Sequence, residues 1–196
     1  MGYRLTNLNI SILILSFSFL SSSCGTIYEK PPSISKAFGA PVPYKDKKHP
    51  GVDYKVNRST PIIACSNGTV WKIIKGDPVK PWGGGYFVMI EHGYYLGKPF
   101  IADYGHLTKI FVSEGEKISR GKLIGLSGAS NDGNFHLHFG LHFGVTGFEN
   151  HYDPNDFWLK RQPNCFDSKK DYSAHSDTEL THPIACGSYA KEITVP

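Results

Sequence analysis

The chain has 196 residues, of which 40% are hydrophobic and 13% aromatic, and its formal net charge is only +4. This length allows one domain with a substantial core plus appended segments. The small charge and the absence of a long basic block in the sequence give no indication of a nucleic-acid partner. The 21 glycines and the short apolar runs favour an all-β domain with many turns.

The N-terminus has the pattern of a secretory signal. Arg4 precedes an apolar run, residues 8–20, that is too short for a membrane-spanning helix and leads into small residues. The small residues before Cys24 resemble a bacterial lipoprotein processing site, although Leu20 stands one position earlier than the leucine usual at such sites. We expect residues 1–23 to be removed and Cys24 to carry a lipid that anchors the protein to a bacterial membrane. The alternative is simple secretion. The expected location of the exported protein is the cell envelope or periplasm.

Export would place the remaining cysteines in an oxidising compartment. Cys165 and Cys186 both lie in a segment without regular patterning, residues 161–196, and we pair them in a disulfide that holds this C-terminal tail. Cys65 follows an apolar segment and is interpreted as a buried strand residue.

The folded domain is predicted to span residues 38–160, after a linker of residues 24–37 that holds it away from the membrane. Short apolar or alternating runs separated by turn residues predict antiparallel strands. The predicted strands are 60–64, 69–74, 86–91, 100–104, 123–127 and 135–143. Helix is expected only for a turn or two in residues 153–160, where Asp153 offers an N-cap. The predicted fold is all-β and antiparallel, with little helix and an irregular tail.

The last predicted strand carries the first indication of chemistry. Side chains alternate between the two faces of a strand, so His136 and His138 share one face while Leu137 and its apolar neighbours share the other. Two imidazoles about 6–7 Å apart on a rigid strand suit half of a metal site, or a ligand beside a catalytic base. The pair alone is also compatible with two surface histidines on an exposed strand.

Two further ligand types occur upstream, in His49 and Asp53. Pro50 and Gly51 between them favour a turn that can bring an imidazole and a carboxylate to a common point. Together with His138 they would supply two neutral nitrogens and one carboxylate oxygen, which leaves an ion with an open position for water. Their spacing alone is equally compatible with an ordinary polar turn.

Three spaced motifs, taken together, resemble those of the lysostaphin-type zinc metallopeptidases, also called the LytM type. The motifs are His49-x-x-x-Asp53, Tyr104-Gly105-His106-Leu107 and His136-Leu137-His138. They occur in the order and at separations similar to those of that family, and the resemblance covers residues 38–160. It implies an antiparallel sandwich or open barrel.

The resemblance also implies a role for each motif residue. His49, Asp53 and His138 would bind one Zn²⁺ ion, and His106 and His136 would form the catalytic pair. Because no Glu adjoins a motif, the general base must be a histidine. One imidazole would take a proton from a metal-activated water and the other would stabilise the oxyanion, in an order that the motifs do not assign.

From the resemblance we expect a zinc-dependent endopeptidase that hydrolyses peptide bonds of bacterial peptidoglycan. The alternative is a catalytically silent or autoinhibited envelope regulator that binds cell-wall amidases or peptidoglycan. All five site positions are present, which argues against a silent protein; the linker or the tail would be the cover of an inhibited one. The sequence indicates neither the bond cleaved nor the oligomeric state.

The remaining features receive no catalytic role. His142 shares the face of His138 but lies about 13 Å away along an extended strand, so it is interpreted as surface or groove lining. His92 is interpreted as a turn residue. The histidines in or near the tail are expected to be solvated, namely His151, His175 and His182. Gly140 replaces a Glu that is frequent in the family, and Trp82 is either a groove wall or part of a flexible turn.

Overall fold

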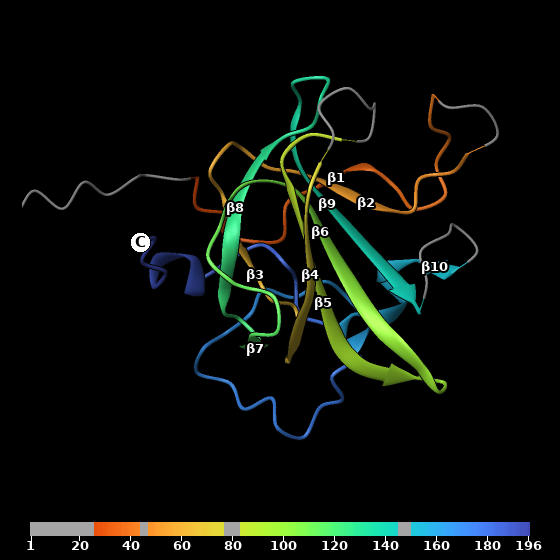
Figure 1. Cartoon of the computed structure of the whole chain (residues 1–196). Helices are drawn as coiled ribbons and strands as arrows, with labels where there is room; N and C mark the ends of the chain where they lie inside the picture. Colours follow the sequence, from red (N-terminus) through yellow and green to blue (C-terminus); the bar gives the residue numbers. More distant parts are fainter. Residues whose placement is uncertain (1–25, 44–46, 77–82, 145–149) are drawn as a thin grey trace, which may run out of the picture.

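The computed structural model describes residues 26–43, 47–76, 83–144 and 150–196 (Figure 1). The expected signal, Cys24 and Trp82 lie outside these residues. Within them, no helix is both long enough and apolar enough to cross a membrane.

One antiparallel sheet dominates the described residues (Figure 1). Its strands are β1 Ile34–Lys36, β2 Gly51–Lys55, β3 Pro61–Ile63, β4 Gly68–Lys75, β5 Tyr86–Tyr95, β6 Lys98–Ile110, β7 Lys117–Ile118, β8 Leu123–Ala129, β9 Phe135–Phe143 and β10 His151–Tyr152. The main path runs β1-β2-β9-β8-β6-β5-β4-β7, while β9 also pairs with β6 and β10, and β3 pairs with β8. Every strand pair is antiparallel, which confirms the predicted fold class.

Strand β9 is central to this arrangement, because it pairs with β2, β6, β8 and β10. Leu137, Phe139 and Leu141 are fully buried in the hydrophobic core on one face of the strand. Phe139 stacks on the Trp158 ring at a centroid distance of 5.9 Å. The alternation of side chains therefore directs His136 and His138 to the opposite face, as the sequence pattern predicts.

The C-terminal tail, blue in Figure 1, completes the core on the face that Leu137 occupies. Leu180 and Ile184 are fully buried there, and Ile184 forms a β-bridge with Ile62 of β3. Cys165 and Cys186 are joined by a disulfide within this tail. The tail is therefore part of the packed structure and lies on the face of the sheet opposite the paired histidines.

The predicted linker differs from an unpaired tether. Its residues Ile34–Lys36 form β1, which pairs with β2 at the open edge of the sheet. Backbone hydrogen bonds from Lys55 N to Ser33 O and from Gly187 N to Tyr28 O hold the segment between β2 and the tail. An extended segment gains these bonds because the outer edge of β2 would otherwise leave its N–H and C=O groups without partners.

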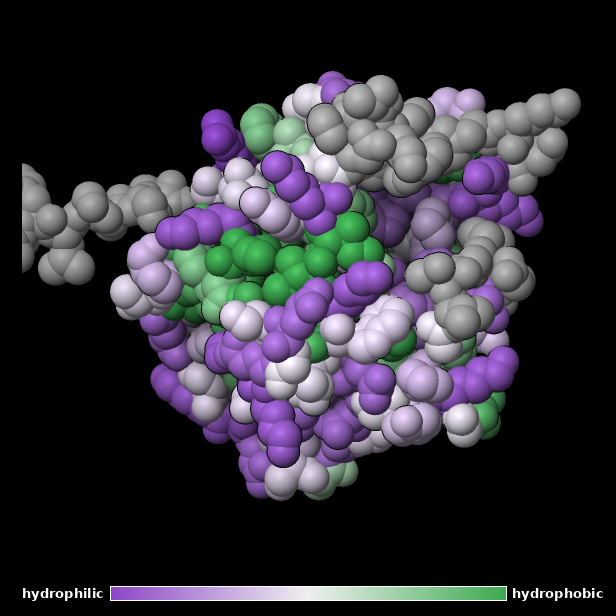
Figure 2. Space-filling view, in the orientation of Figure 1, coloured by the Kyte–Doolittle hydropathy of each residue, from purple (hydrophilic) through white to green (hydrophobic). Residues whose placement is uncertain are grey.

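Helix in the described residues is confined to short 3₁₀ turns, at Pro154–Phe157, Leu159–Arg161 and Tyr189–Lys191. The first of them begins at the predicted N-cap, where the Asp153 side chain accepts a hydrogen bond from Asn155 N. In the view of Figure 2, hydrophilic residues surround an apolar patch over β4 and β8, so this face of the molecule is mainly polar.

Candidate metal centre

The first and last motifs meet because β2 and β9 are neighbours. Asp53 on β2 lies directly opposite His138 on β9, and His49 stands in the turn that leads into β2. Gly51 permits this close approach, since a Cβ atom there would lie 2.5 Å from Phe139 O and 2.9 Å from His138 Cε1. Any larger residue would push the turn that carries His49 away from β9.

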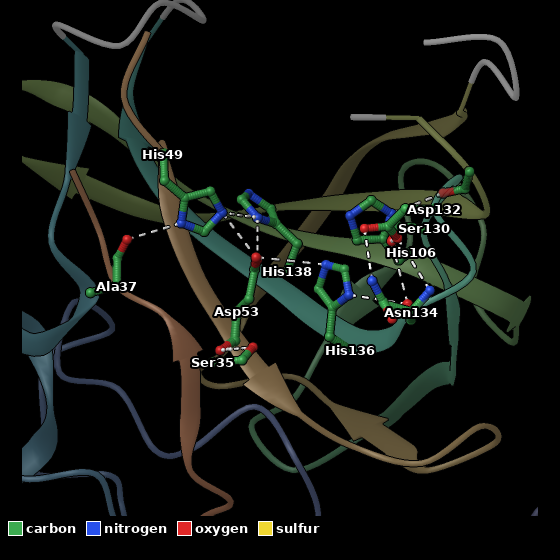
Figure 3. Close-up of polar contacts among 11 residues, drawn as sticks. Ser35, Ala37, His49, Asp53, His106, Ser130, Asp132, Asn134, His136 and His138 are labelled. Carbon is green, nitrogen blue, oxygen red and sulfur yellow. Dashed lines mark hydrogen bonds and ion pairs between the residues drawn. The ribbon is translucent and has the colours of Figure 1, made fainter. Parts of the chain in front are cut away.

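The three donor atoms converge on one point (Figure 3). Asp53 Oδ1 lies 3.0 Å from both His49 Nε2 and His138 Nδ1, and the two nitrogens are 3.1 Å apart. A tetrahedral ion with bonds of about 2.0–2.1 Å separates its ligand atoms by about 3.3 Å. The observed triangle is therefore within a few tenths of an ångström of the size that zinc requires.

The linker orients one of these ligands. His49 Nδ1 lies 3.1 Å from the Ala37 carbonyl oxygen, which can only accept, so Nδ1–H is the donor (Figure 3). This bond leaves the lone pair of a neutral imidazole on Nε2, the nitrogen that faces Asp53. Metal-binding histidines usually donate their second nitrogen in this way. The contribution of residues 34–37 was not predicted, because nothing in their composition marks them as partners of a distant turn.

Asp53 is largely buried, and burial on its own would raise the pKa of its carboxyl group. Close contacts with the ring nitrogens of His138 and His49, and the positive charge that these imidazoles carry when protonated, outweigh this effect and lower the pKa of Asp53 below its ordinary value. The side chain is therefore a carboxylate at neutral pH, which is the form that binds a cation.

His106 is placed by a change of partner along β6. Gly105 still pairs with His138 of β9, whereas Leu107 pairs with Ser127 of β8, and His106 between them has a φ of 61°. A residue with a side chain rarely adopts this left-handed conformation, and such outliers cluster at functional sites. Its imidazole is held by Nδ1–H donation to the Gly84 carbonyl, 3.1 Å away.

His136 lies beside His106. The His106 and His136 rings meet edge to face with centroids 4.6 Å apart, and His136 Nε2 is 3.7 Å from Asp53 Oδ2 (Figure 3). His136 Nδ1–H is donated to Asn134 O at 3.2 Å. Both imidazoles thus use Nδ1 to fix their orientation, and in the neutral form both keep a lone pair on Nε2.

The electrostatic environment favours the neutral form of both rings. Burial, assisted by the nearby His138 and His136 imidazoles, lowers the pKa of His106 to about 4. Burial also lowers the pKa of His136, against the opposing charge of Asp53. All five residues predicted as site residues are therefore brought together, with two neutral bases beside a His–Asp–His triangle.

Several other histidines were placed wrongly by the sequence interpretation. His142 is fully buried and lines neither the surface nor a groove, and His182 is fully buried and not solvated. His92 is buried within strand β5 and does not lie in a turn. His182 packs edge to face on the Tyr54 ring because the tail folds over the core. Burial lowers the pKa of His92 to about 4 and that of His182 to about 3. Cys65 is buried with a free thiol, as predicted.

Comparison with known proteins identifies close parallels. The sequence model of Peptidase family M23 matches residues 47–154. The peptidoglycan DD-endopeptidase ShyA of Vibrio cholerae is 36% identical over 104 residues, which are 52% of this chain and 22% of that protein. The chain therefore spans only about a fifth of the length of the curated relatives it matches.

Solved structures agree with this match. The catalytic domain of lysostaphin from Staphylococcus simulans is 26% identical, with a TM-score of 0.55 over 64% of this chain and 91% of that domain. The structure of LytU is 32% identical, with a TM-score of 0.51 over 63% of this chain and 82% of that chain.

Proposed function

The chain belongs to Peptidase family M23, and on this premise we propose that it is a zinc-dependent endopeptidase that hydrolyses peptide bonds of bacterial peptidoglycan. The observation that carries the proposal is the convergence of His49, Asp53 and His138 on one point, with His106 and His136 beside it. The Vibrio cholerae relative is named a peptidoglycan DD-endopeptidase, which supports the substrate class.

The donor set fits zinc. Two imidazole nitrogens and one carboxylate oxygen match the three-ligand sets of catalytic zinc sites, which keep a fourth position open. When bound, zinc would supply a Lewis acid that polarises an amide carbonyl and increases the acidity of water. His49, Asp53 and His138 would hold the ion, and the Ala37 carbonyl would orient His49.

His106 and His136 would carry the proton transfers. Because the Nδ1–H groups are committed to Gly84 O and Asn134 O, proton exchange with substrate or water must occur through Nε2. A neutral Nε2 can take a proton from an attacking water molecule. The protonated ring can then donate to the developing oxyanion or to the leaving amine nitrogen.

We further propose that the mature protein begins at an acylated Cys24, in the cell envelope or periplasm, and that residues 38–160 are the peptidase domain. In the described part of the chain, β1 packs beside β2 and the tail packs on the core face. These positions favour a structural role for the linker and the tail, in which they stabilise the domain and do not inhibit it.

Digestion of purified peptidoglycan tests the proposal. The protein is incubated with peptidoglycan, with and without a chelator, and the released fragments are identified by mass spectrometry. We expect new fragments from cleaved peptide bonds, none with chelator, and recovery after Zn²⁺ is restored. A folded, zinc-loaded protein that binds peptidoglycan and releases nothing would instead support the envelope regulator.

A further inference from the structure

A groove with a volume of about 840 Å³ lies between the linker and the adjoining ends of β2 and β9. Residues 26–33 line one side of it, and Lys55, Val56, Asn57 and Phe135 line the other. We propose that this linker groove binds an extended peptide substrate beyond the cleaved bond, and that Lys55 pairs with a carboxylate of that peptide. The inference rests on the proposed function, because it names the kind of peptide that the peptidase centre would receive.

The linker groove begins beside the catalytic pair. Lys55 lies directly opposite His136 in the pairing of β2 with β9, and Phe135 is the residue before His136. Lys55 is two residues after Asp53, so its side chain leaves β2 on the face of the metal centre. Side chains directly opposite each other on one face of an antiparallel pair have Cβ atoms about 4.5–5.5 Å apart. A peptide whose amide lies at the metal centre beside His136 therefore passes within reach of the Lys55 ammonium group.

Hydrogen bonds hold the linker beside the strand ends. The backbone N–H of Asn57 donates to the Tyr28 hydroxyl, and the Asn57 side-chain amide donates to the Thr26 hydroxyl. Tyr28 also forms a β-bridge with Cys186, a disulfide-bonded residue of the tail. The groove is therefore formed before a ligand arrives, which lowers the entropic cost of binding. Its linker side lies outside residues 47–154, so it is a feature of this chain beyond the match to Peptidase family M23.

The charges of the lining favour an anion. Two lysines, Lys30 and Lys55, line the groove, and neither forms an ion pair with another described residue. The single acidic residue of the lining, Glu29, pairs with Lys191 at 3.1 Å. A carboxylate in the groove would meet the two ammonium groups, while the charge of Glu29 is largely offset by its own partner. Lys55 stands on the strand next to His136, so we assign it the contact nearest the cleaved bond.

The groove also offers apolar surface to a peptide chain. Phe135 and Ile27 are 45% and 47% exposed, and Pro31 and Pro32 add apolar rings on the linker side. Apolar surface with a few placed charged groups is typical of ligand-binding grooves. A peptide with a free carboxylate uses both parts of this lining. An inorganic anion would use only the lysines, and an acyl chain would use only the apolar side chains.

Binding of peptidoglycan fragments tests this inference. Soluble peptide fragments are prepared from purified peptidoglycan, and one portion is treated with carbodiimide and ammonia, which converts the carboxylates to carboxamides. Zinc-loaded His106→Ala protein, in which hydrolysis should be too slow to interfere, is titrated with each portion by calorimetry. We expect the untreated peptides to bind about fivefold more tightly, the contribution of one well-formed exposed ion pair. Adding Lys55→Met should abolish this ratio, and adding Lys55→Arg should keep it. The matched control is Lys98→Met, at an exposed lysine that begins β6, and it should also keep the ratio.

Several results would overturn the inference. They are a parent protein that fails to prefer the untreated peptides, and a preference that survives Lys55→Met. Phe135→Ala should weaken the binding of both portions and leave their ratio unchanged; unchanged affinity for both would exclude the linker groove as the binding surface. Hydrolysis is measured separately, with protein that keeps His106. Carboxylate-dependent binding without hydrolysis would remove the proposed peptidase and leave the groove, whereas hydrolysis without the preference would remove the groove and leave the peptidase.

Discussion

Two His–Asp–His groups lie on one face of the same sheet, and they differ in their surroundings. Beside His49, Asp53 and His138 stand two further imidazoles, His106 and His136, each with Nδ1 bonded to a carbonyl. In the group of Asp103, His142 and His151, the first two side chains are buried, and His151 on the short strand β10 is partly exposed. Three ligands are enough to hold an ion, but hydrolysis also needs groups that move protons. Converging ligand atoms and neighbouring bases therefore distinguish the candidate catalytic centre from the second group.

The largest effect is expected from loss of a ligand in the first group. His138→Ala removes one of three donors, so Zn²⁺ at this centre and peptidoglycan cleavage should both fall to the level of chelator-treated wild type. Metal analysis and fragment release measure the two effects on the same sample. If the variant keeps wild-type cleavage, the ligand assignment is wrong.

The second-largest effect is expected from loss of a catalytic histidine, which should change the rate of hydrolysis and not the binding of zinc. His106→Ala should lower kcat by about 10²–10⁴-fold, the usual contribution of a general acid or base, while Zn²⁺ content stays unchanged. His175→Ala, in the tail, provides the control for a substituted histidine. Equal kcat for His106→Ala and the wild type would exclude the proposed catalytic pair.

Acid should weaken the core before it protonates the site carboxylate. Burial lowers the pKa of His92 from 6.5 to about 4, so in this pH range the unfolded chain binds a proton that the folded chain does not. The contribution of neutral His92 to the free energy of unfolding is therefore fully present above pH 6.5. It is lost as the pH drops toward 4, which lowers the free energy of unfolding by on the order of 3 kcal/mol. Denaturant unfolding of wild type and His92→Gln between pH 7 and pH 4 measures it. The same slope in both proteins would contradict the assignment to His92.

The smallest effect concerns the orientation of His49. A chain that begins at residue 38 lacks the Ala37 carbonyl, and its Zn²⁺ affinity should fall by about 10–100-fold, as for other losses of a group that orients a ligand. A chain that begins at residue 33 keeps β1 and this carbonyl and is the matched control. Equal affinity of the two truncated chains would show that the linker does not orient the ligand.

Local patterns in the sequence were sufficient for the fold class and for the two halves of the metal centre, whereas the resemblance to the lysostaphin-type family was needed to join the halves and to assign their roles. Period-two alternation places His136 and His138 on one face whatever the strand's neighbours are. The turn residues Pro50 and Gly51 bring His49 toward Asp53 by short-range geometry. These features depend on a few adjacent residues, so they can be read without knowledge of the remaining structure.

Contacts between distant segments were decided only by the tertiary structure. The burial of His182 depends on the tail folding over β3, and the Asp103–His142 pair depends on the register between β6 and β9. The Ala37 carbonyl meets His49 only because residues 34–36 pair with β2. Such contacts follow from strand pairing and core packing over long separations, and the free energy of those interactions is not encoded in any short stretch of the chain.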